Sequence, residues 1–358
     1  MKSELSTIEI RALVNEMQFL TGARVDKIHN TADSVVFQLY SKEGKKFLKV
    51  AKKLLYICSE KQEALQPSQF CQLLRKYVEN KRISTIKQHE SERIIILSTE
   101  NNSLVIELFG QANIILCDKN GIIIAALRIQ ASGNIVKPKA KYEFPAREVN
   151  ILKIKEKEFS DLVKKSKNEI VKTLASFVGG LYAEEICLRA GINKNKKNPE
   201  DSEIKKLFSA FSSLLNERAM PFVVYDNSKI KDAVPFDLQI YGNFTKVAFS
   251  SFYEALDFAL KESEGQEKTT EAEKKYAKQI QKIEEIISLQ KKTLESLKKE
   301  HEENKRAGES VYENYNEIKN ILSAFEEAKK KMPLPEIKSK IKNKKIISVE
   351  NSKIMVDL

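Results

Sequence analysis

The chain has 358 residues, 42% hydrophobic and 31% charged, so we expect two or three globular units rather than one ordinary domain. No apolar run approaches the roughly 20 residues that a membrane-spanning helix needs. The first ten residues lack the apolar core of a signal peptide, so the sequence predicts a cytoplasmic protein that does not enter a membrane.

The formal net charge of +12 is unevenly distributed along the chain. Residues 1–150 carry +7 and residues 151–218 carry +4, whereas residues 219–262 carry −2, residues 263–331 carry 0 and residues 332–358 carry +3. Two interpretations stay open. A basic globular region suits a polyanionic partner, because each phosphate contact releases counterions. It also suits the solvated surface of a lysine-rich protein.

The cysteines and histidines do not form a metal-binding pattern. The four cysteines are widely spaced and make no C-x-x-C pair: Cys58, Cys71, Cys117 and Cys187. We interpret each as a small buried apolar residue. The three histidines are equally scattered, so neither a metal site nor a cofactor is predicted.

The first 150 residues combine a helical pattern with many strand-like runs. Residues 6–22 predict an amphipathic helix, in which Ser6 and Glu9 have the spacing of a capping box. From residue 24 the apolar period changes to two, which predicts four strands, a second helix after Pro67 and four more strands. The sequence therefore predicts an α+β, sheet-rich N-terminal domain over residues 1–150.

After residue 150 the composition changes twice. Residues 151–218 carry short helical patterns and predict a helical domain with a turn at its adjacent glycines. Strand-like runs return in FVVYD, FDLQIY and KVAFS within residues 219–262, which we expect to pack back on the first domain. The run SFYEALDFAL predicts a short amphipathic helix, and EGQEKTTEAE predicts a polar hinge after it.

Residues 263–331 have the alternating three- and four-residue apolar spacing of a coiled coil. The apolar positions run in one register from Tyr276 to Phe325, but they weaken over residues 301–308, where we expect a bend or break. Such a helix needs a partner, which a hairpin at this break or self-association would supply. Residues 332–358 predict a small basic tail containing strands.

Several ordered stretches resemble the NFACT family, whose members act in ribosome quality control. The matching stretches are ELSTIEIRALVNEMQFLTGARVDKIHN, QPSQFCQLLRKYVENKRISTIKQ with SERIIILS, LVIELFGQANIILCD, FVGGLYAEEICLRAGI and FSSFYEALDFAL. Together they cover nearly the whole chain. The family's second coiled-coil helix and C-terminal RNA-binding domain have no counterpart before the chain stops, so we expect a fragment or a short form.

The resemblance implies a fold and a function. It implies an N-terminal domain built like formamidopyrimidine-DNA glycosylase, then a helix-hairpin-helix domain and a coiled-coil helix. It also implies binding to tRNA and to a large ribosomal subunit that still holds peptidyl-tRNA, which supports C-terminal tailing of the stalled peptide. No enzymatic activity of the chain itself is expected.

The resemblance also selects candidate tRNA-binding residues. The family's Asp-Arg pair corresponds to Glu92 and Arg93, and an Asp of its opening helix corresponds to Glu9. The remaining candidates lie in matching stretches or in a local basic cluster: Arg75, Lys76, Glu107, Asn113, Gly179 and Gly180. An arginine fork suits unstacked loop bases, and a Gly-Gly turn before a helix exposes N–H groups to a phosphate. Ordinary surface or turn roles stay open for each.

Two other functions are weighed against this one. A glycosylase-like enzyme needs an amine nucleophile with a nearby carboxylate, but the second residue is Lys2 and no catalytic constellation is evident. A fibronectin-binding surface adhesin, which the family's older name suggests, conflicts with the missing signal peptide and the unpaired cysteines.

Overall fold

The computed structural model describes residues 2–60, 63–131, 134–145, 149–334, 336–337, 346–350 and 353–356. The chain divides into two compact units, Met1–Lys268 and Thr269–Leu358. None of the described helices is both long enough and apolar enough to cross a membrane.

The first unit contains two antiparallel sheets with sequential strand order. The four-stranded sheet contains β1 (Arg24–Asn30), β2 (Ser34–Ser41), β3 (Gly44–Ala51) and β4 (Leu54–Cys58). The five-stranded sheet contains β5 (Thr85–Gln88), β6 (Ile94–Ser98), β7 (Asn102–Glu107), β8 (Asn113–Asp118) and β9 (Ile123–Ala126). The helix α2 (Gln69–Val78) connects the sheets, and a small hairpin of β10 (Gln130–Ala131) and β11 (Asn134–Ile135) follows.

The helix α1 (Thr7–Glu16) opens the unit as its sequence predicts. The capping box is confirmed, because the Ser6 side chain accepts from the Glu9 N–H and the Glu9 carboxylate accepts from the Ser6 N–H at 2.8 Å. The α-helix is shorter than predicted, since it passes into a 3₁₀ turn over Met17–Leu20.

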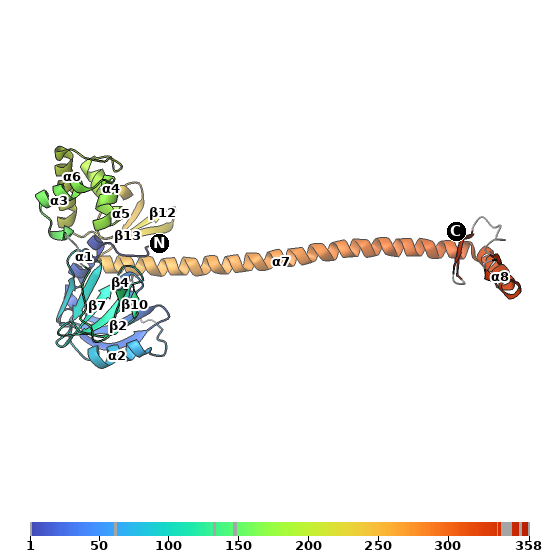
Figure 1. Ribbon diagram of the computed structural model, residues 1–358, viewed down its shortest axis with the longest axis horizontal. Coiled ribbons are helices and arrows are strands. Elements are labelled where there is room, and N and C mark those ends of the chain that lie inside the picture. The colour runs from blue at the N-terminus through green and yellow to red at the C-terminus, as the bar shows by residue number, and fades with distance from the viewer. Residues whose placement is uncertain are drawn as a thin grey trace. The chain divides into compact units, whose positions relative to one another are not determined.

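Four helices form a second layer of the first unit (Figure 1). They are α3 (Glu156–Lys165), α4 (Ile170–Val178), α5 (Gly180–Ala190) and α6 (Asp201–Asn216). A three-stranded antiparallel sheet of order β13-β12-β14 lies beside α5, and its strands are β12 (Phe222–Asp226), β13 (Lys229–Val234) and β14 (Thr245–Ala248).

Two elements join the sheet core to the helical core. Side chains alternate between the faces of a strand, and in β12 this places Val223 in the core of the sheets and Val224 in the core of the helices. In the same way α1 buries Leu13 in the first core and Ile8 in the second. Figure 1 shows α1 between the two layers. Residues 219–262 therefore pack against both cores.

The predicted strand FDLQIY is wrong. Its second half is a 3₁₀ turn, Gln239–Tyr241. The N–H groups of Gln239 and Ile240 donate to the carboxylate of Glu185, at 2.9 and 3.0 Å, rather than to a neighbouring strand. The same carboxylate, which is fully buried, accepts from Arg189 Nε at 2.6 Å. A distant side chain thus decides the local backbone conformation.

The helix α7 (Phe252–Glu313) is much longer than the sequence suggests. Neither the predicted hinge at residues 264–273 nor the predicted break at 301–308 interrupts it, and it ends only before Asn314. The helix-forming Glu, Lys and Ala residues outweigh the cost of the two glycines in this helix, which is about 1 kcal/mol each. After it come α8 (Tyr315–Lys331), β15 (Ile346–Glu350) and β16 (Lys353–Val356), and the last two form an antiparallel hairpin.

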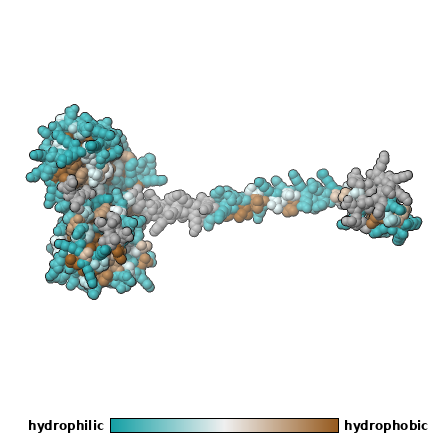
Figure 2. Space-filling model, in the orientation of Figure 1, coloured by the Kyte–Doolittle hydropathy of each residue, from teal (hydrophilic) through white to brown (hydrophobic). Residues whose placement is uncertain are grey.

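In the second unit, α7 exposes a row of large apolar side chains, which we name the α7 seam. Its members are between 44% and 56% exposed: Ile280, Ile283, Ile287, Leu294 and Leu297. Figure 2 shows apolar patches along this helix among hydrophilic surroundings. These are core positions of the predicted heptad register.

Candidate functional site

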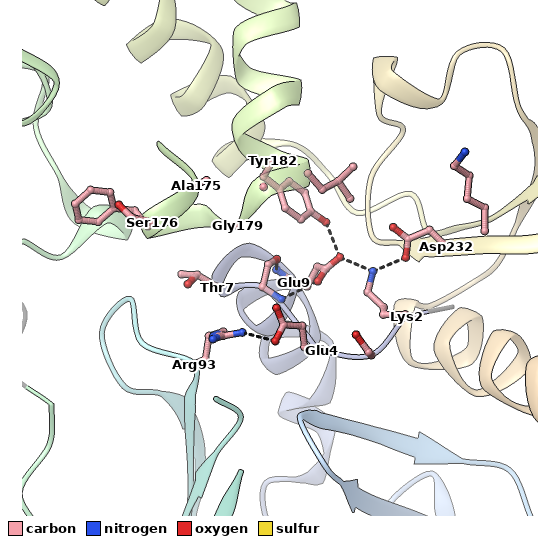
Figure 3. Close-up of a pocket in the computed structure, with 16 residues that line it drawn as sticks. Lys2, Glu4, Thr7, Glu9, Arg93, Ala175, Ser176, Gly179, Tyr182 and Asp232 are labelled. Carbon is pink, nitrogen blue, oxygen red and sulfur yellow. Dashed lines mark hydrogen bonds and ion pairs between the residues drawn. The ribbon is translucent and has the colours of Figure 1, made fainter. Parts of the chain in front are cut away.

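A pocket of about 470 Å³ lies in the first unit, between the sheet layer and the helical layer. The start of α1, the end of the β5–β6 turn, the junction of α4 with α5, and β13 all contribute to its lining. Figure 3 shows the side chains that converge on it. Lys2, Glu9 and Asp232 form one wall, and Glu4 and Arg93 form another.

The α4–α5 junction forms the third side of the pocket. Gly179 has φ of +90° and ends α4 while α5 begins at Gly180. A Cβ at Gly179 would lie 3.2 Å from the Ser6 Cβ, so the approach of this turn to α1 depends on a glycine. No side chain caps α5. Its first-turn N–H groups, which have no partner within the helix, belong to residues that line the pocket.

Lys2 is the centre of a buried ion network. Its ammonium lies 2.8 Å from Glu9 Oε1 and 2.6 Å from Asp232 Oδ1, and it donates to the Ala233 carbonyl at 2.8 Å. The side chains of Lys2 and Glu9 are only 8% and 3% exposed. Burial opposes the charge on Lys2, but the two carboxylates outweigh this effect and raise its pKa. The ammonium therefore stays protonated.

Two tyrosines complete this network. Tyr182 Oη donates to Glu9 Oε1 at 3.1 Å, and Tyr241 Oη donates to Asp232 Oδ2 at 2.9 Å. Burial, and then the negative charge of Glu9, raise the pKa of Tyr182 well above its ordinary value. Each carboxylate therefore has a cation and a hydroxyl as partners, and this wall has few contacts left to offer a ligand.

The wall formed by Arg93 is more exposed. Arg93 Nη1 lies 3.1 Å from Glu4 Oε2, and Lys53 Nζ lies 2.9 Å from the same oxygen. The side chains of Arg93 and Glu4 are 29% and 47% exposed. The hydrogen bond from Lys53 lowers the pKa of Glu4; partial burial opposes this effect, and Arg93 adds to it. Two cations thus share one solvated carboxylate, which leaves positive charge at this rim of the pocket.

Comparison with known proteins places the chain in a family. The family profile described as NFACT N-terminal and middle domains matches residues 6–357. The chain belongs to the NFACT family. This confirms the resemblance inferred from the sequence.

Named relatives of this NFACT chain are ribosome quality control proteins. The archaeal Rqc2 homolog aRqcH of Methanocaldococcus jannaschii is 34% identical, and the match covers 96% of this chain and 55% of that protein. The human ribosome quality control complex subunit NEMF is 23% identical, over 87% of this chain and 33% of that protein. The chain thus spans between a third and just over half the length of these relatives.

Two solved structures share the fold of most of this chain. The fibrinogen-binding protein of Staphylococcus aureus matches with a TM-score of 0.58 and 22% identity, over 70% of this chain and 97% of that one. The N-terminal part of the fibronectin/fibrinogen-binding protein of Streptococcus suis also matches with a TM-score of 0.58, at 19% identity, over 72% of this chain and 100% of that one. At such identities the likeness concerns the fold alone.

The NFACT pocket brings together four of the residues predicted from the sequence: Glu9, Arg93, Gly179 and Gly180. Glu92 lies next to it in the chain but is only 6% exposed. Its backbone carbonyl accepts from Gln88 Nε2 at 2.9 Å, and Gln88 also donates to the Thr7 carbonyl of α1. The backbone at Glu92 is thus tied to the first turn of α1.

The two predicted residues on α2 lie elsewhere and make different contacts. Arg75 Nε donates to the Ile28 carbonyl of β1 at 2.7 Å, so this guanidinium attaches α2 to the sheet. Lys76 is exposed and lies over the Tyr77 ring, 5.4 Å from its centroid. Neither residue lines the NFACT pocket.

The predicted pair on β7 and β8 is also outside the pocket. Glu107 accepts from Tyr142 Oη at 2.7 Å, and burial raises the pKa of this carboxyl group although the hydrogen bond opposes the shift. Asn113 is 1% exposed, and its side chain donates to the Arg128 carbonyl and accepts from the Arg128 N–H. Through these contacts, Glu107 and Asn113 hold Tyr142 and Arg128 against the sheet.

Sequence reasoning missed Lys2, Tyr182 and Asp232 as parts of the site. Tyr182 lies in the matched stretch FVGGLYAEEICLRAGI, which offered a signal. Lys2 stands out in the sequence only as an amine without evident catalytic partners. Nothing around Asp232 marks it, because its role depends on β13 packing beside α1.

Potential metal ligands do not cluster. Within the described ranges, no group of three or more His, Cys, Asp or Glu side chains is placed to hold a metal ion. All four cysteines are buried and unpaired, which confirms their interpretation as small core residues.

Proposed function

We propose that this NFACT chain binds tRNA and the large ribosomal subunit in ribosome quality control, and that it acts by binding rather than by catalysis. The names of its relatives support the assignment to ribosome quality control. A basic composition supports a polyanionic partner. We further propose that the recognised subunit is obstructed by peptidyl-tRNA and that binding supports C-terminal tailing of the stalled chain in the cytoplasm.

The observation that carries this proposal is the exposed wall of the pocket. Arg93 and Lys53 place two cations around a single solvated carboxylate, while the uncapped first turn of α5 lines the same pocket. A nucleic-acid phosphate that replaced Glu4 would gain the planar guanidinium fork of Arg93 and helix N–H groups. An extruded loop base would instead stack on the guanidinium.

The ion network argues against a lyase in the same fold. A lysine nucleophile needs a lowered pKa, whereas the pKa of Lys2 is raised and its ammonium is surrounded by Glu9, Asp232 and the Ala233 carbonyl. The adhesin alternative gains no support from the names of two structural neighbours, because their likeness concerns only the fold.

The proposal also assigns a domain type to the helical layer and a role to α7. We assign α3–α6 as a helix-hairpin-helix domain whose central turn is Gly179–Gly180, and α7 as one helix of a coiled coil. The exposed α7 seam supports the second assignment, because such a row of apolar side chains needs a partner helix. A returning helix of the longer family layout or a second copy of this chain would supply it.

Substitution of Arg93 tests the function. Arg93→Lys keeps the charge but loses the planar fork, so a shaped contact fails in Arg93→Lys nearly as much as in Arg93→Ala. We expect both variants of the 358-residue chain to lose about 1–3 kcal/mol of tRNA binding, the range for a bidentate contact. Fluorescence anisotropy with labelled tRNA at two salt concentrations measures it.

Arg218 supplies the matched control, since it is exposed and lies outside the pocket. Arg218→Lys and Arg218→Ala should bind tRNA like the unsubstituted chain. Thermal unfolding of every variant separates binding from folding. If Arg93→Lys folds normally and binds tRNA without loss, the shaped contact is disproved. Glu92→Asp restores the family residue and should leave binding unchanged or tighter.

A further inference from the structure

A row of four side chains runs from Arg82, beside β1, across β1, β2 and β3 of the four-stranded sheet. Arg24 of β1 is directly opposite Tyr40 of β2, and Tyr40 is directly opposite Lys45 of β3. On its other side, Arg24 forms an isolated antiparallel bridge with Arg82. Directly opposed residues lie on one face of a sheet. The four side chains therefore form one transverse row of roughly 14 Å, given the spacing of neighbouring strands.

The cations of this row are poorly compensated. Arg24 and Arg82 are opposed like charges, an arrangement that destabilises a sheet. Arg24 has one weak ion pair, with Asp26 at 3.4 Å, while Arg82 Nη1 donates to the Gly22 carbonyl at 2.9 Å. Among the described residues no carboxylate lies within ion-pair distance of Arg82 or Lys45. An anionic partner would relieve this repulsion.

An aromatic ring lies in the middle of the row. Tyr40 is 43% exposed, and the Arg24 guanidinium lies 5.8 Å from its ring centroid. Surfaces for single-stranded nucleic acid combine backbone-binding cations with aromatic side chains on which bases stack. An acidic protein would use the cations but has no base to stack on Tyr40. The composition of the row thus favours RNA.

The row is separate from the pocket. Lys45 lies at the start of β3, whereas Lys53, whose ammonium contacts Glu4 of the pocket, follows the end of that strand. The length of β3 from Lys45 to Ala51 is roughly 20 Å. None of the four row residues lines the pocket. Substitutions at the two places should therefore act independently.

We propose that this row is a second RNA-binding surface, which holds a single-stranded segment with one base on Tyr40 and the flanking phosphates on Arg24, Arg82 and Lys45. The proposal rests on the proposed function insofar as both name RNA as the partner. It adds a binding surface that does not use Arg93 or the α5 N-terminus.

The test uses the 358-residue chain and a labelled single-stranded RNA of about twelve nucleotides, within the site sizes of such surfaces. Arg24→Gln with Arg82→Gln should weaken binding about tenfold. The slope of log affinity against log salt should become shallower by about 1.4, because each phosphate contact on a single strand contributes about 0.7. Lys205→Gln with Lys206→Gln removes the same charge from exposed positions on α6 and serves as the control.

Tyr40 separates stacking from charge. Tyr40→Leu should weaken binding of the oligonucleotide about tenfold, whereas Tyr40→Phe keeps the ring and should bind normally. Equal losses in the arginine pair and the Lys205/Lys206 control, or normal binding by Tyr40→Leu, would overturn the proposal; the second result would mean that no base stacks on Tyr40. Arg93→Ala should leave oligonucleotide binding intact while it weakens tRNA binding. Oligonucleotide binding therefore tests the row, whereas tRNA binding by Arg93→Ala tests the pocket.

Discussion

Lys2 and Arg93 lie on two walls of one pocket, and both contact carboxylates, yet their surroundings differ. Lys2 is 8% exposed and contacts two largely buried carboxylates and a carbonyl. Arg93 is 29% exposed and shares the half-exposed Glu4 with Lys53. This comparison separates a charge that stabilises the fold from a charge that is available to a ligand. A buried cation with every partner in place holds α1 and β13 together, whereas a solvated cation with a shared partner can exchange it for a ligand.

The largest effect should come from breaking the buried wall. Lys2→Met leaves Glu9 and Asp232 buried without their cation, which typically costs about 3–5 kcal/mol. Urea unfolding of the unsubstituted chain and of Lys2→Met measures the loss. A change below about 1 kcal/mol would mean that the network is solvated, and the distinction between the two walls would fail.

The same network should be sensitive to alkaline pH. Because the pKa of Lys2 is raised above its ordinary 10.5, the unfolded chain releases this proton at lower pH than the folded chain does. The stabilisation is therefore fully present below about 10.5 and is lost as pH rises through the higher folded value. In Lys2→Met this alkaline loss should be smaller.

The glycine turn between the walls offers a matched pair of intermediate size. Gly179→Ala meets both a φ of +90° and a Cβ contact of 3.2 Å with Ser6, so we expect it to cost more than about 1 kcal/mol. Gly180 is helical, and an added Cβ there meets nothing within 4 Å, so Gly180→Ala should stabilise by about 0.4–1 kcal/mol. Thermal unfolding compares them. Equal effects would contradict the tight approach of the turn to α1.

The smallest effect should come from the exposed wall. Glu4→Gln removes a solvated ion pair and should cost no more than about 1 kcal/mol. Because the pKa of Glu4 is lowered from 4.5, its contribution is present above that pH and disappears as pH falls through the lower folded value. The free energy of unfolding should therefore change less between pH 7 and pH 3 in the variant than in the unsubstituted chain. Solvent screening keeps this difference small. A larger loss than in Lys2→Met would reverse the comparison.

Local patterns predicted local structure well and failed where a distant group intervened. The Ser6–Glu9 box needs only neighbours three residues apart, and it is confirmed. The strand FDLQIY failed because Glu185, which is more than 50 residues away, accepts its N–H groups.

The site was predicted in part for the same reason. The family motifs identified Arg93 and Gly179, because each lies in a recognisable local stretch. Lys2 and Asp232 are 230 residues apart, and only the packing of β13 beside α1 brings them together. Asn113 was chosen by motif, and its contacts with the Arg128 backbone are ones that no local pattern indicates.

The helix α1 has a mechanical consequence at its far end. The carboxylate of Glu16 accepts from the Phe252 N–H at 2.8 and 2.9 Å and so caps the first turn of α7. Glu9, at the pocket, is seven residues earlier on the same helix, roughly 10 Å along its axis. A pull on the start of α7 therefore reaches the pocket through two turns of stiff helix rather than through a loop. The start of α7 and the pocket are therefore held by side chains near opposite ends of the same short helix.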